Sequence, residues 1–343
     1  MKKSAWASFW LVGIIWGSSF LLIRVGVSGV SATQVVFTRT AIAAVGLSLL
    51  AYSRGLRFPK DIRIIRALLI LGIFNVTIPY MFISFGEQAI PSGMAAVLQA
   101  TAALFGLVIA HFAFVDERIT RRKLLGLAVG FSGVFLLSAD AINPASPFFS
   151  PLLALSLPQF TVAGESSGLN IHFLLGQLAI VAASFCYAGS TSFSRKVMAH
   201  YKVPPLITSA STFLVGASLG FVFMFIEPLL GGRGYTPYNE LENNILFAIL
   251  GLGFINTFIA YMFFYFIIQE LGAFRATMVT YVVPAVGLIL GWLVLGEKIS
   301  STMFLGAGLI FIGIGIINIK LKLLFKRPEA FIPPPVTLST ERI

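Results

Sequence analysis

Long apolar stretches follow one another along most of the chain, and each is close to the ~20 residues that a helix needs to cross a bilayer. Short polar or charged segments separate these stretches. The pattern predicts an all-α polytopic membrane protein with ten spanning helices, at residues 6–27, 34–53, 65–86, 92–114, 122–139, 171–193, 206–227, 245–268, 276–296 and 302–320.

Composition agrees with this interpretation. Hydrophobic residues make up 57% of the 343 residues and charged residues 11%, whereas soluble domains have roughly 45–50% and 25%. A soluble protein of this length could not cover its surface with so few charges, so the bilayer is expected to be the solvent. The single cysteine, Cys186, excludes an internal disulfide framework and a multi-cysteine metal site. No cofactor and no metal are expected.

The basic residues are distributed unequally between the two sides of the predicted membrane. If the N-terminus is cytoplasmic, 20 of the 24 Lys and Arg residues fall on the cytoplasmic side, and only Arg233 and Lys298 fall outside. The protein is then expected in the cell membrane (inner or plasma membrane). Both termini, including the basic and proline-rich tail 321–343, are expected in the cytoplasm, and the loop 140–170 is expected outside. The net charge of +11 faces anionic lipid, so no nucleic-acid partner is expected.

The chain contains an internal repeat. LGIFNVTIPYMFISFGEQ at 71–88 aligns without gaps on LGFINTFIAYMFFYFIIQ at 252–269, and nine of the eighteen positions are identical. The matches include polar residues, which apolar composition alone does not explain. The turns DERIT and GEKIS match as well. The opening helices match more weakly, with IIWGSSFLLIR over FCYAGSTSFSR.

Each copy, 1–139 and 171–320, holds five of the predicted helices. An odd number makes the second copy enter the membrane from the opposite side, so we expect two inverted repeats related by a two-fold axis in the membrane plane. This arrangement recurs in secondary transporters, in which the halves rock about a site near the midplane. The repeat therefore favours transport by alternating access.

These sequences resemble the EamA family of the drug/metabolite transporter superfamily. The resemblance is carried by WGSSFLLIRVGV (16–27), VVFTRT (35–40), the stretch 74–120 and the duplicated acidic turn, and it covers about 6–139 and 171–320. It implies a ten-helix transporter of small organic metabolites, amino-acid-like or amphipathic, often working outward. The proline usual in the family's fourth helix is replaced by Leu104, while the second copy has Pro284. A helix kink is thus expected in the second half alone.

Arg39 is the strongest candidate for a substrate contact. It lies inside a predicted span, where a bare cation costs at least ~2.5–3.5 kcal/mol. Two interpretations stay open. Arg39 contacts a carboxylate or other anionic group of the substrate, or it has a structural role, snorkelling or pairing with helix carbonyls. The aligned residue of the second copy is Ser209, so the site would be electrically asymmetric.

Further polar and aromatic residues of the spans are candidates for the transport pathway. The repeated pair Asn75 and Asn256 either lines the pathway or, slightly favoured, forms hydrogen bonds between helices worth ~0.6 kcal/mol on average. The rings of Trp16, Tyr80 and Tyr261 suit an amphipathic cavity, although ordinary packing is the favoured interpretation for any one of them.

Gln99 and Thr101 place polar groups in the fourth helix, where we expect them to line the cavity. Glu87 is the carboxylate closest to a span interior. It is a candidate proton or amine site, but solvation at the outer mouth is the favoured interpretation.

The acidic turns favour structural roles. Glu117 and Glu297 precede Thr120 and Ser300, whose hydroxyls are expected to cap the next helix while the acids counter its dipole. Small faces on the fifth and tenth helices predict close helix packing as the main interpretation, and a homodimer through these faces stays an open alternative. These faces contain Gly126, Gly130, Gly133, Gly306, Gly308 and Gly313.

Other classes of function fit the sequence less well. An enzyme would need a nucleophile, a metal cluster or paired carboxylates, and the three histidines and scattered acids do not stand at such spacings. A nucleotide-driven pump would need a phosphate-binding loop in a soluble domain, and the sequence contains neither. A channel, or a receptor or regulatory protein on the same fold, stays as the alternative to a transporter of a small-molecule substrate.

Overall fold

The computed structural model describes residues 2–114, 118–142, 171–272, 276 and 278–318. Within these ranges the chain is helical, with no strand, as the apolar pattern predicts. The helices of the first half are α1 (Lys2–Gly29), α2 (Ala32–Ser53), α3 (Ile62–Gly72), η1 (Ile73–Thr77), α4 (Ile78–Ala89), α5 (Ser92–Gln99), α6 (Thr101–Ala113) and α7 (Arg121–Ile142).

The second half repeats this order of elements. It consists of α9 (Ile171–Tyr201), α10 (Pro205–Ile226), the short η2 (Glu227–Leu230) and η3 (Tyr238–Glu240), α11 (Asn243–Gly253), η4 (Phe254–Ile259), α12 (Ala260–Leu271), η5 (Met278–Tyr281), α14 (Val282–Leu295) and α15 (Ser301–Asn318).

Eight helical segments of the described chain are long and apolar enough to cross a membrane. They are 3–29, 32–53, 62–89, 92–113, 171–201, 205–230, 243–271 and 278–295. The stretch Ser301–Ile317 is apolar but shorter, and α7, which starts with three basic residues, is not among the eight. The structure thus supports a polytopic membrane protein with at least these spans.

Two of the long segments contain a π-helical turn at the same place in each half. In η1 the Thr77 hydroxyl donates to the Gly72 carbonyl at 3.0 Å, and in η4 the Thr257 hydroxyl donates to the Leu252 carbonyl at 2.9 Å. Each hydroxyl reaches the carbonyl five residues back, which matches the wider π-helical turn. Such turns are rare and often occur at functional sites.

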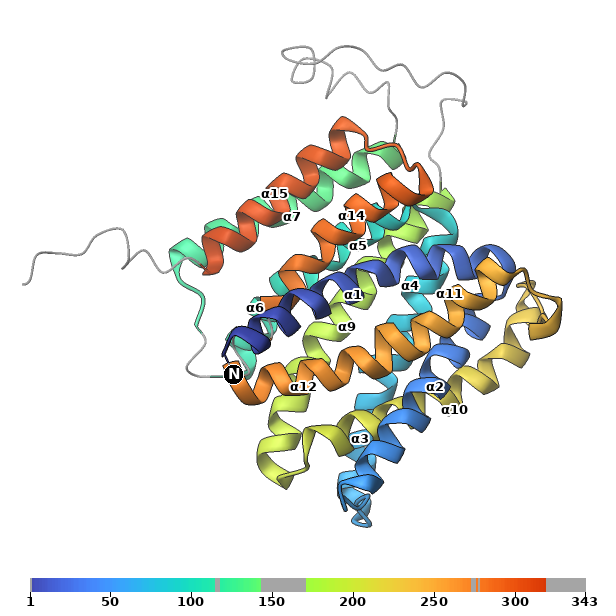
Figure 1. Cartoon of the computed structure of the whole chain (residues 1–343). Helices are drawn as coiled ribbons and strands as arrows, with labels where there is room; N and C mark the ends of the chain where they lie inside the picture. Colours follow the sequence, from blue (N-terminus) through green and yellow to red (C-terminus); the bar gives the residue numbers. More distant parts are fainter. Residues whose placement is uncertain (1, 115–117, 143–170, 273–275, 277, 319–343) are drawn as a thin grey trace, which may run out of the picture.

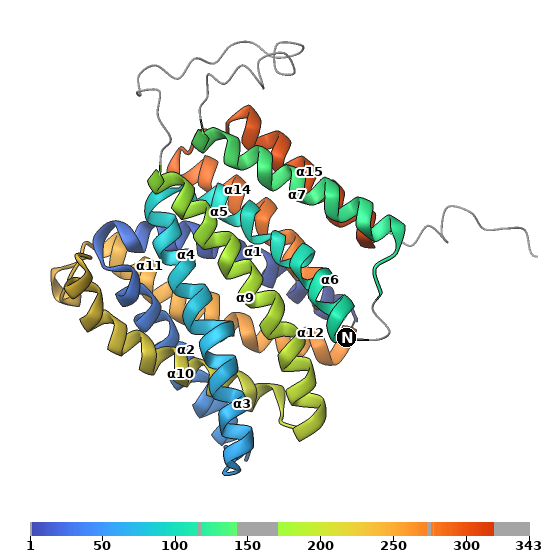
Figure 2. The same cartoon turned by 180° about the vertical axis from the view of Figure 1, so that it is seen from behind.

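The two halves interlock, and corresponding helices make corresponding contacts. The helix α1 packs across α11, α12 and α14 of the second half, while α9 packs across α4, α5 and α6 of the first. The helix α2 lies against α10, and α7 lies against α15 (Figures 1 and 2). The first helix of each half is therefore enclosed mainly by the other half.

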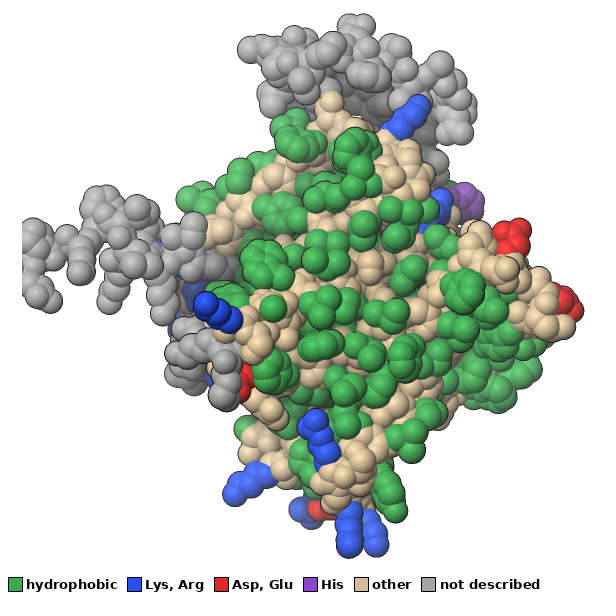
Figure 3. All heavy atoms as spheres, viewed as in Figure 1, with side chains coloured by type: hydrophobic (Ala, Val, Ile, Leu, Met, Phe, Trp, Pro, Cys, Tyr) green, Lys and Arg blue, Asp and Glu red, His purple; other side chains and the backbone are tan. Residues whose placement is uncertain are grey.

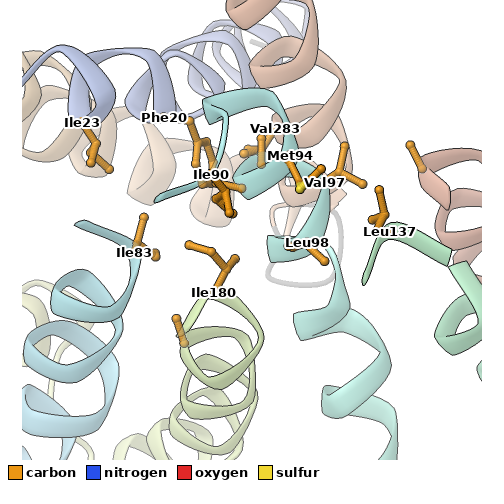
Figure 4. Packing of buried hydrophobic residues seen from close by; sticks show 14 of the residues in the cluster. Phe20, Ile23, Ile83, Ile90, Met94, Val97, Leu98, Leu137, Ile180 and Val283 are labelled. Carbon is orange, nitrogen blue, oxygen red and sulfur yellow. The ribbon is translucent and has the colours of Figure 1, made fainter. Parts of the chain in front are cut away.

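The largest buried cluster joins helices of both halves, including α1, α4, α5, α9, α11 and α15. Figure 4 shows Ile83, Ile90 and Ile180 lying close together below Phe20. Outside this core the helices stay apolar. Figure 3 shows hydrophobic side chains spread over the visible face, with Lys and Arg side chains toward its edges. Exposed residues such as Leu293 at 62% suit contact with acyl chains.

The glycine faces of α7 and α15 pack against each other within the chain. A Cβ at Gly133 would lie 2.6 Å from the Gly306 carbonyl oxygen, and one at Gly313 would lie 2.6 Å from the Gly126 carbonyl oxygen. Close helix packing is therefore confirmed for these positions, whereas Gly308 has no neighbouring atom within 4 Å of such a Cβ.

Candidate functional site

Arg39 lies where the two halves meet. Its side chain is 8% exposed. The Arg39 Nε donates to the Thr257 hydroxyl at 2.9 Å, and the guanidinium carbon lies 4.0 Å from the centre of the Tyr80 ring. The side chain therefore neither snorkels to the surface nor pairs with helix carbonyls, the two structural roles expected for it. Instead α2 connects α4 of its own half with η4 of the other.

A series of aromatic contacts begins at the Tyr80 ring, on which Arg39 lies. Measured between ring centres, Tyr80 lies 6.5 Å from Tyr187 and 6.3 Å from Phe213, and Phe213 lies 5.2 Å from Tyr261. The ring centres of Trp16 and Tyr261 are 5.8 Å apart. Trp16, Tyr80 and Tyr261, all predicted from the sequence, thus belong to one aromatic cluster. Two further residues complete it: Phe213 links Tyr80 to Tyr261, and Tyr187 packs on Tyr80.

One of those two residues had a signal in the sequence. Tyr187 occupies the position of Trp16 in the alignment of the opening helices, and Tyr80 occupies that of Tyr261. The contact between Trp16 and Tyr261 therefore has its counterpart in the contact between Tyr187 and Tyr80. Phe213 had no such signal, because an apolar ring in an apolar helix stands out in no pattern.

The two repeated asparagines have different surroundings. Asn256 is 2% exposed, and its Nδ2 donates to the Ile15 carbonyl, to Ser18 Oγ at 2.9 Å and to Ser19 Oγ at 3.1 Å. It therefore bonds η4 to α1, as the interhelical interpretation expects. Asn75 is half-buried, and no hydrogen bond of its side chain is seen among the described residues.

Glu87 is fully buried, so the expectation of a solvated carboxylate at the mouth is wrong. Its side chain is 0% exposed, because α1 and α9 cover this end of α4. Neither carboxylate oxygen has a hydrogen-bond partner in the described chain. Arg24 donates to the Glu87 backbone carbonyl. Arg24, Arg39 and Glu297 all lie within electrostatic reach of the carboxylate.

Glu297 caps a helix of the other half, and not the helix that follows it. Its two carboxylate oxygens accept hydrogen bonds from the backbone N–H groups of Ser92 at 2.7 Å and Gly93 at 2.9 Å, at the start of α5. The Ser300 hydroxyl does cap its own helix, accepting from the Met303 N–H at 3.1 Å. Glu117, the counterpart of Glu297, lies outside the described residues.

The comparisons with known proteins agree with the arrangement of two similar halves. Residues 5–139 and 174–319 both match the model of the EamA-like transporter family. The chain belongs to the EamA-like transporter family. The resemblance stated from the motifs is confirmed, and the protein is a membrane transporter and not an enzyme.

Curated relatives of this transporter match it over most of its length. It is 26% identical to an uncharacterized transporter of Archaeoglobus fulgidus, over 92% of this chain and 99% of the relative. It is 24% identical to a probable amino-acid metabolite efflux pump of Escherichia coli (strain K12), over 89% and 92%. It is 22% identical to a probable terminal-alkyne amino-acid exporter of Streptantibioticus cattleyicolor, over 97% and 98%.

A solved structure has the same fold. This crystal structure of a protein 18% identical to the transporter superposes with a TM-score of 0.58, over 96% of this chain and 100% of that one. At this level of identity the likeness concerns the fold alone.

The fourth helix of the transporter breaks in the first half despite its missing proline. The helix α5 ends at Gln99 and α6 begins at Thr101, so a helix interruption is not confined to the second half. Next to it, the Thr101 hydroxyl donates to the Leu98 carbonyl at 2.7 Å. Pro284 lies in the first turn of α14, directly after η5.

Gln99 and Thr101 differ in what they offer to a solute. Thr101 is fully buried, with its hydroxyl engaged in its own helix. Gln99 is half-buried and its Oε1 atom has no hydrogen-bond partner in the described part of the chain. No group of three or more His, Cys, Asp or Glu side chains suitable for a metal ion occurs among the described residues.

Proposed function

We propose that this transporter exports small organic metabolites of the amino-acid type by alternating access. The observation that carries the proposal is the cluster around Arg39, where one buried cation meets aromatic rings from both halves. A guanidinium beside aromatic walls suits a solute with a carboxylate and an apolar body. Two relatives named for amino-acid compounds support this substrate class and the outward direction.

The proposed movement is a rocking of residues 6–139 against 171–320, with ten helices in two inverted repeats. The matched contacts of the two halves support it, since each opening helix packs against the other half. The hydrogen bond from Arg39 to Thr257 crosses between the halves. Rocking would therefore alter the surroundings of Arg39 directly, and substrate binding there would be linked to the conformation.

The proposed pathway uses the residues singled out from the sequence in different ways. Arg39 binds the anionic group, and the rings of Trp16, Tyr80 and Tyr261 enclose the apolar part of the solute. Asn75, whose side chain shows no hydrogen bond among the described residues, offers a polar contact to the solute. We assign three further residues to the edges of the pathway, where they shape the helices: Gln99, Thr101 and Asn256.

The transporter is proposed to lie in the inner or plasma membrane of the cell, with both termini in the cytoplasm. The excess of basic residues on that side supports it. We propose a monomer, because the glycine faces available for a homodimer pack within the chain. A channel or a receptor on the same fold is not favoured, since neither explains a buried cation bonded across the two halves.

Efflux from proteoliposomes tests the proposal. Vesicles that contain the purified protein are loaded with a mixture of the twenty standard amino acids, and mass spectrometry measures what leaves them. We expect export of a subset of the mixture, reduced at least tenfold in Arg39→Ala and less in Arg39→Lys. If no solute leaves faster than from protein-free vesicles, in this mixture or in a cell metabolite extract, the transporter proposal is wrong.

A further inference from the structure

The membrane-embedded acid Glu87 differs from the other well-buried acid that the structure describes. Glu227 accepts hydrogen bonds from the backbone N–H of Thr33, at 3.0 Å, and from the Thr33 hydroxyl. Glu297, half-buried, accepts two backbone N–H groups. Glu87 accepts none among the described residues. A carboxylate without partners is costly in a dry interior, so Glu87 needs either a proton or a cation from outside the protein.

Arg39 is also only partly used by the protein. A guanidinium has five N–H donors in a flat fork. In the described chain one of them, at Nε, is seen to donate, to Thr257. One face of the guanidinium lies over the Tyr80 ring. The two Nη atoms remain for a ligand, and paired N–H groups of this kind match the two oxygens of a carboxylate.

Glu87 and Tyr80, the ring that Arg39 stacks on, lie along one face of α4. Tyr80 and Glu87 are seven residues apart, so they project from the same side of the helix, about 10 Å apart along its axis. Arg39 stacks on Tyr80, so Glu87 lies about two helical turns further along the same face of α4. An α-amino acid carries its ammonium and carboxylate on one carbon, so with a hydrogen bond at each end it bridges groups roughly 8 Å apart.

We propose that Arg39 and Glu87 form a binding site for zwitterionic amino acids, with Arg39 on the carboxylate and Glu87 on the ammonium group. The inference rests on the proposed function, since it names the recognition of a transported solute. Arg24 holds the backbone of Glu87 and is a positioning residue. The carboxylate is covered in the described conformation, so the solute reaches it when the halves rock apart.

The charged groups around Glu87 come from several elements. They are Arg24 on α1, Arg39 on α2 and Glu297 before α15. On α9, His172 lines a surface pocket together with Gln88, the residue that follows Glu87 in the sequence. The formal charges of Arg24 and Arg39 balance those of Glu87 and Glu297. A zwitterion keeps this balance, whereas a bare amine adds a positive charge. The site is therefore expected to discriminate against solutes that carry a positive charge alone.

Matched derivatives of amino acids test the site. Proteoliposomes are loaded with the twenty amino acids, with their N-acetyl derivatives, which lack the ammonium group, or with their methyl esters, which lack the carboxylate. We expect the wild type to export the unmodified amino acids at least tenfold faster than either derivative. Glu87→Gln should reduce amino-acid export at least tenfold and remove the preference over N-acetyl derivatives. Arg39→Gln should remove the preference over methyl esters.

Two further variants make the result decisive. Glu240→Gln changes an exposed acid of η3 that is no part of the proposed site, and its export rates should equal those of the wild type. If Glu87→Gln does not fold, Glu87→Asp keeps the charge and should retain the amino-acid preference at a reduced rate.

Three outcomes would overturn the inference. Equal export of amino acids and N-acetyl derivatives by the wild type would refute the ammonium site and leave transport itself standing. An unchanged preference in Glu87→Gln, with the effect of an imposed pH gradient lost, would show that Glu87 carries a proton. Export of a solute other than amino acids would refute the substrate class. Absence of any transport would instead refute the proposed function.

Discussion

The π-helical turns of the two halves carry the same asparagine in different surroundings. In η4, Asn256 is bonded to three groups of α1, and Thr257 accepts a hydrogen bond from Arg39. In η1, Asn75 shows no side-chain bond among the described residues, and the Thr77 hydroxyl bonds only within its own helix. The turn of the second half is thus fixed to the first half, while its counterpart is less constrained.

The difference shows how a duplicated sequence acquires a lopsided site. Arg39 has Ser209 as its counterpart, and Ser209 is bonded to Tyr265. Where the first half supplies a cation, the second supplies a hydroxyl that contacts a neighbour in its own half. Repeated residues therefore set the frame of the two halves, and unrepeated residues make the surroundings of Arg39 asymmetric in charge.

The largest effect is expected from removing the asparagine that is bonded between helices. Asn256→Leu removes the amide nitrogen that makes all three contacts with α1, and it places a larger apolar side chain beside the serine hydroxyls. We expect a loss of about 2–4 kcal/mol of stability, because the amide contacts to the Ser19 hydroxyl and to the Ile15 carbonyl are lost together, although Ser18 keeps its bond to that carbonyl. Thermal unfolding in detergent measures it. A loss no greater than that of Asn75→Leu would contradict the comparison.

A smaller effect is expected from the hydroxyl that bonds Arg39. Thr257→Val keeps the shape but removes the acceptor for Arg39 Nε and the bond to the Leu252 carbonyl. We expect a destabilisation of about 1–3 kcal/mol, together with lower amino-acid export. The matched control is Thr77→Val, which removes the helix bond alone. Equal export by the two variants would show that the bond from Arg39 does not matter for transport.

The cap provided across the halves by Glu297 comes next in size. Glu297→Ala leaves the N–H groups of Ser92 and Gly93 without their acceptor. Loss of a helix cap costs about 0.5–2 kcal/mol, and we expect the same here. Hydrogen exchange at the start of α5 checks this, since those two amides should exchange faster. Ser300→Ala, which removes a cap within one half, should leave their exchange unchanged.

The smallest effect on stability is expected at the free asparagine. Asn75→Ala removes no hydrogen bond seen among the described residues, so stability should fall by less than about 0.6 kcal/mol. A cysteine at position 75 should react with a water-soluble maleimide faster than one at position 256, which is buried. Cys186 is replaced by Ala in both variants. Equal labelling would show that the two turns are equally accessible.

Much of the site could be predicted, but its partners could not. The repeat pointed to Asn256, Tyr80 and Tyr261, because polar and aromatic matches stand out against an apolar background. Arg39 stood out because a cation inside a span is costly. The burial of Glu87 was missed, since sequence position alone placed it at a helix end. The interruption at Ala100 could not be predicted, because no proline marks it in the sequence.

The sequence by itself determined the helices, the two similar halves and the membrane as solvent. These follow from local apolar length, from composition and from internal identity, and none depends on which helices touch. Only the tertiary structure decided that Glu297 caps α5, that Thr257 bonds Arg39 and that Glu87 lies covered without a partner. In each case the decisive neighbour is distant in the chain, so no local pattern records the contact.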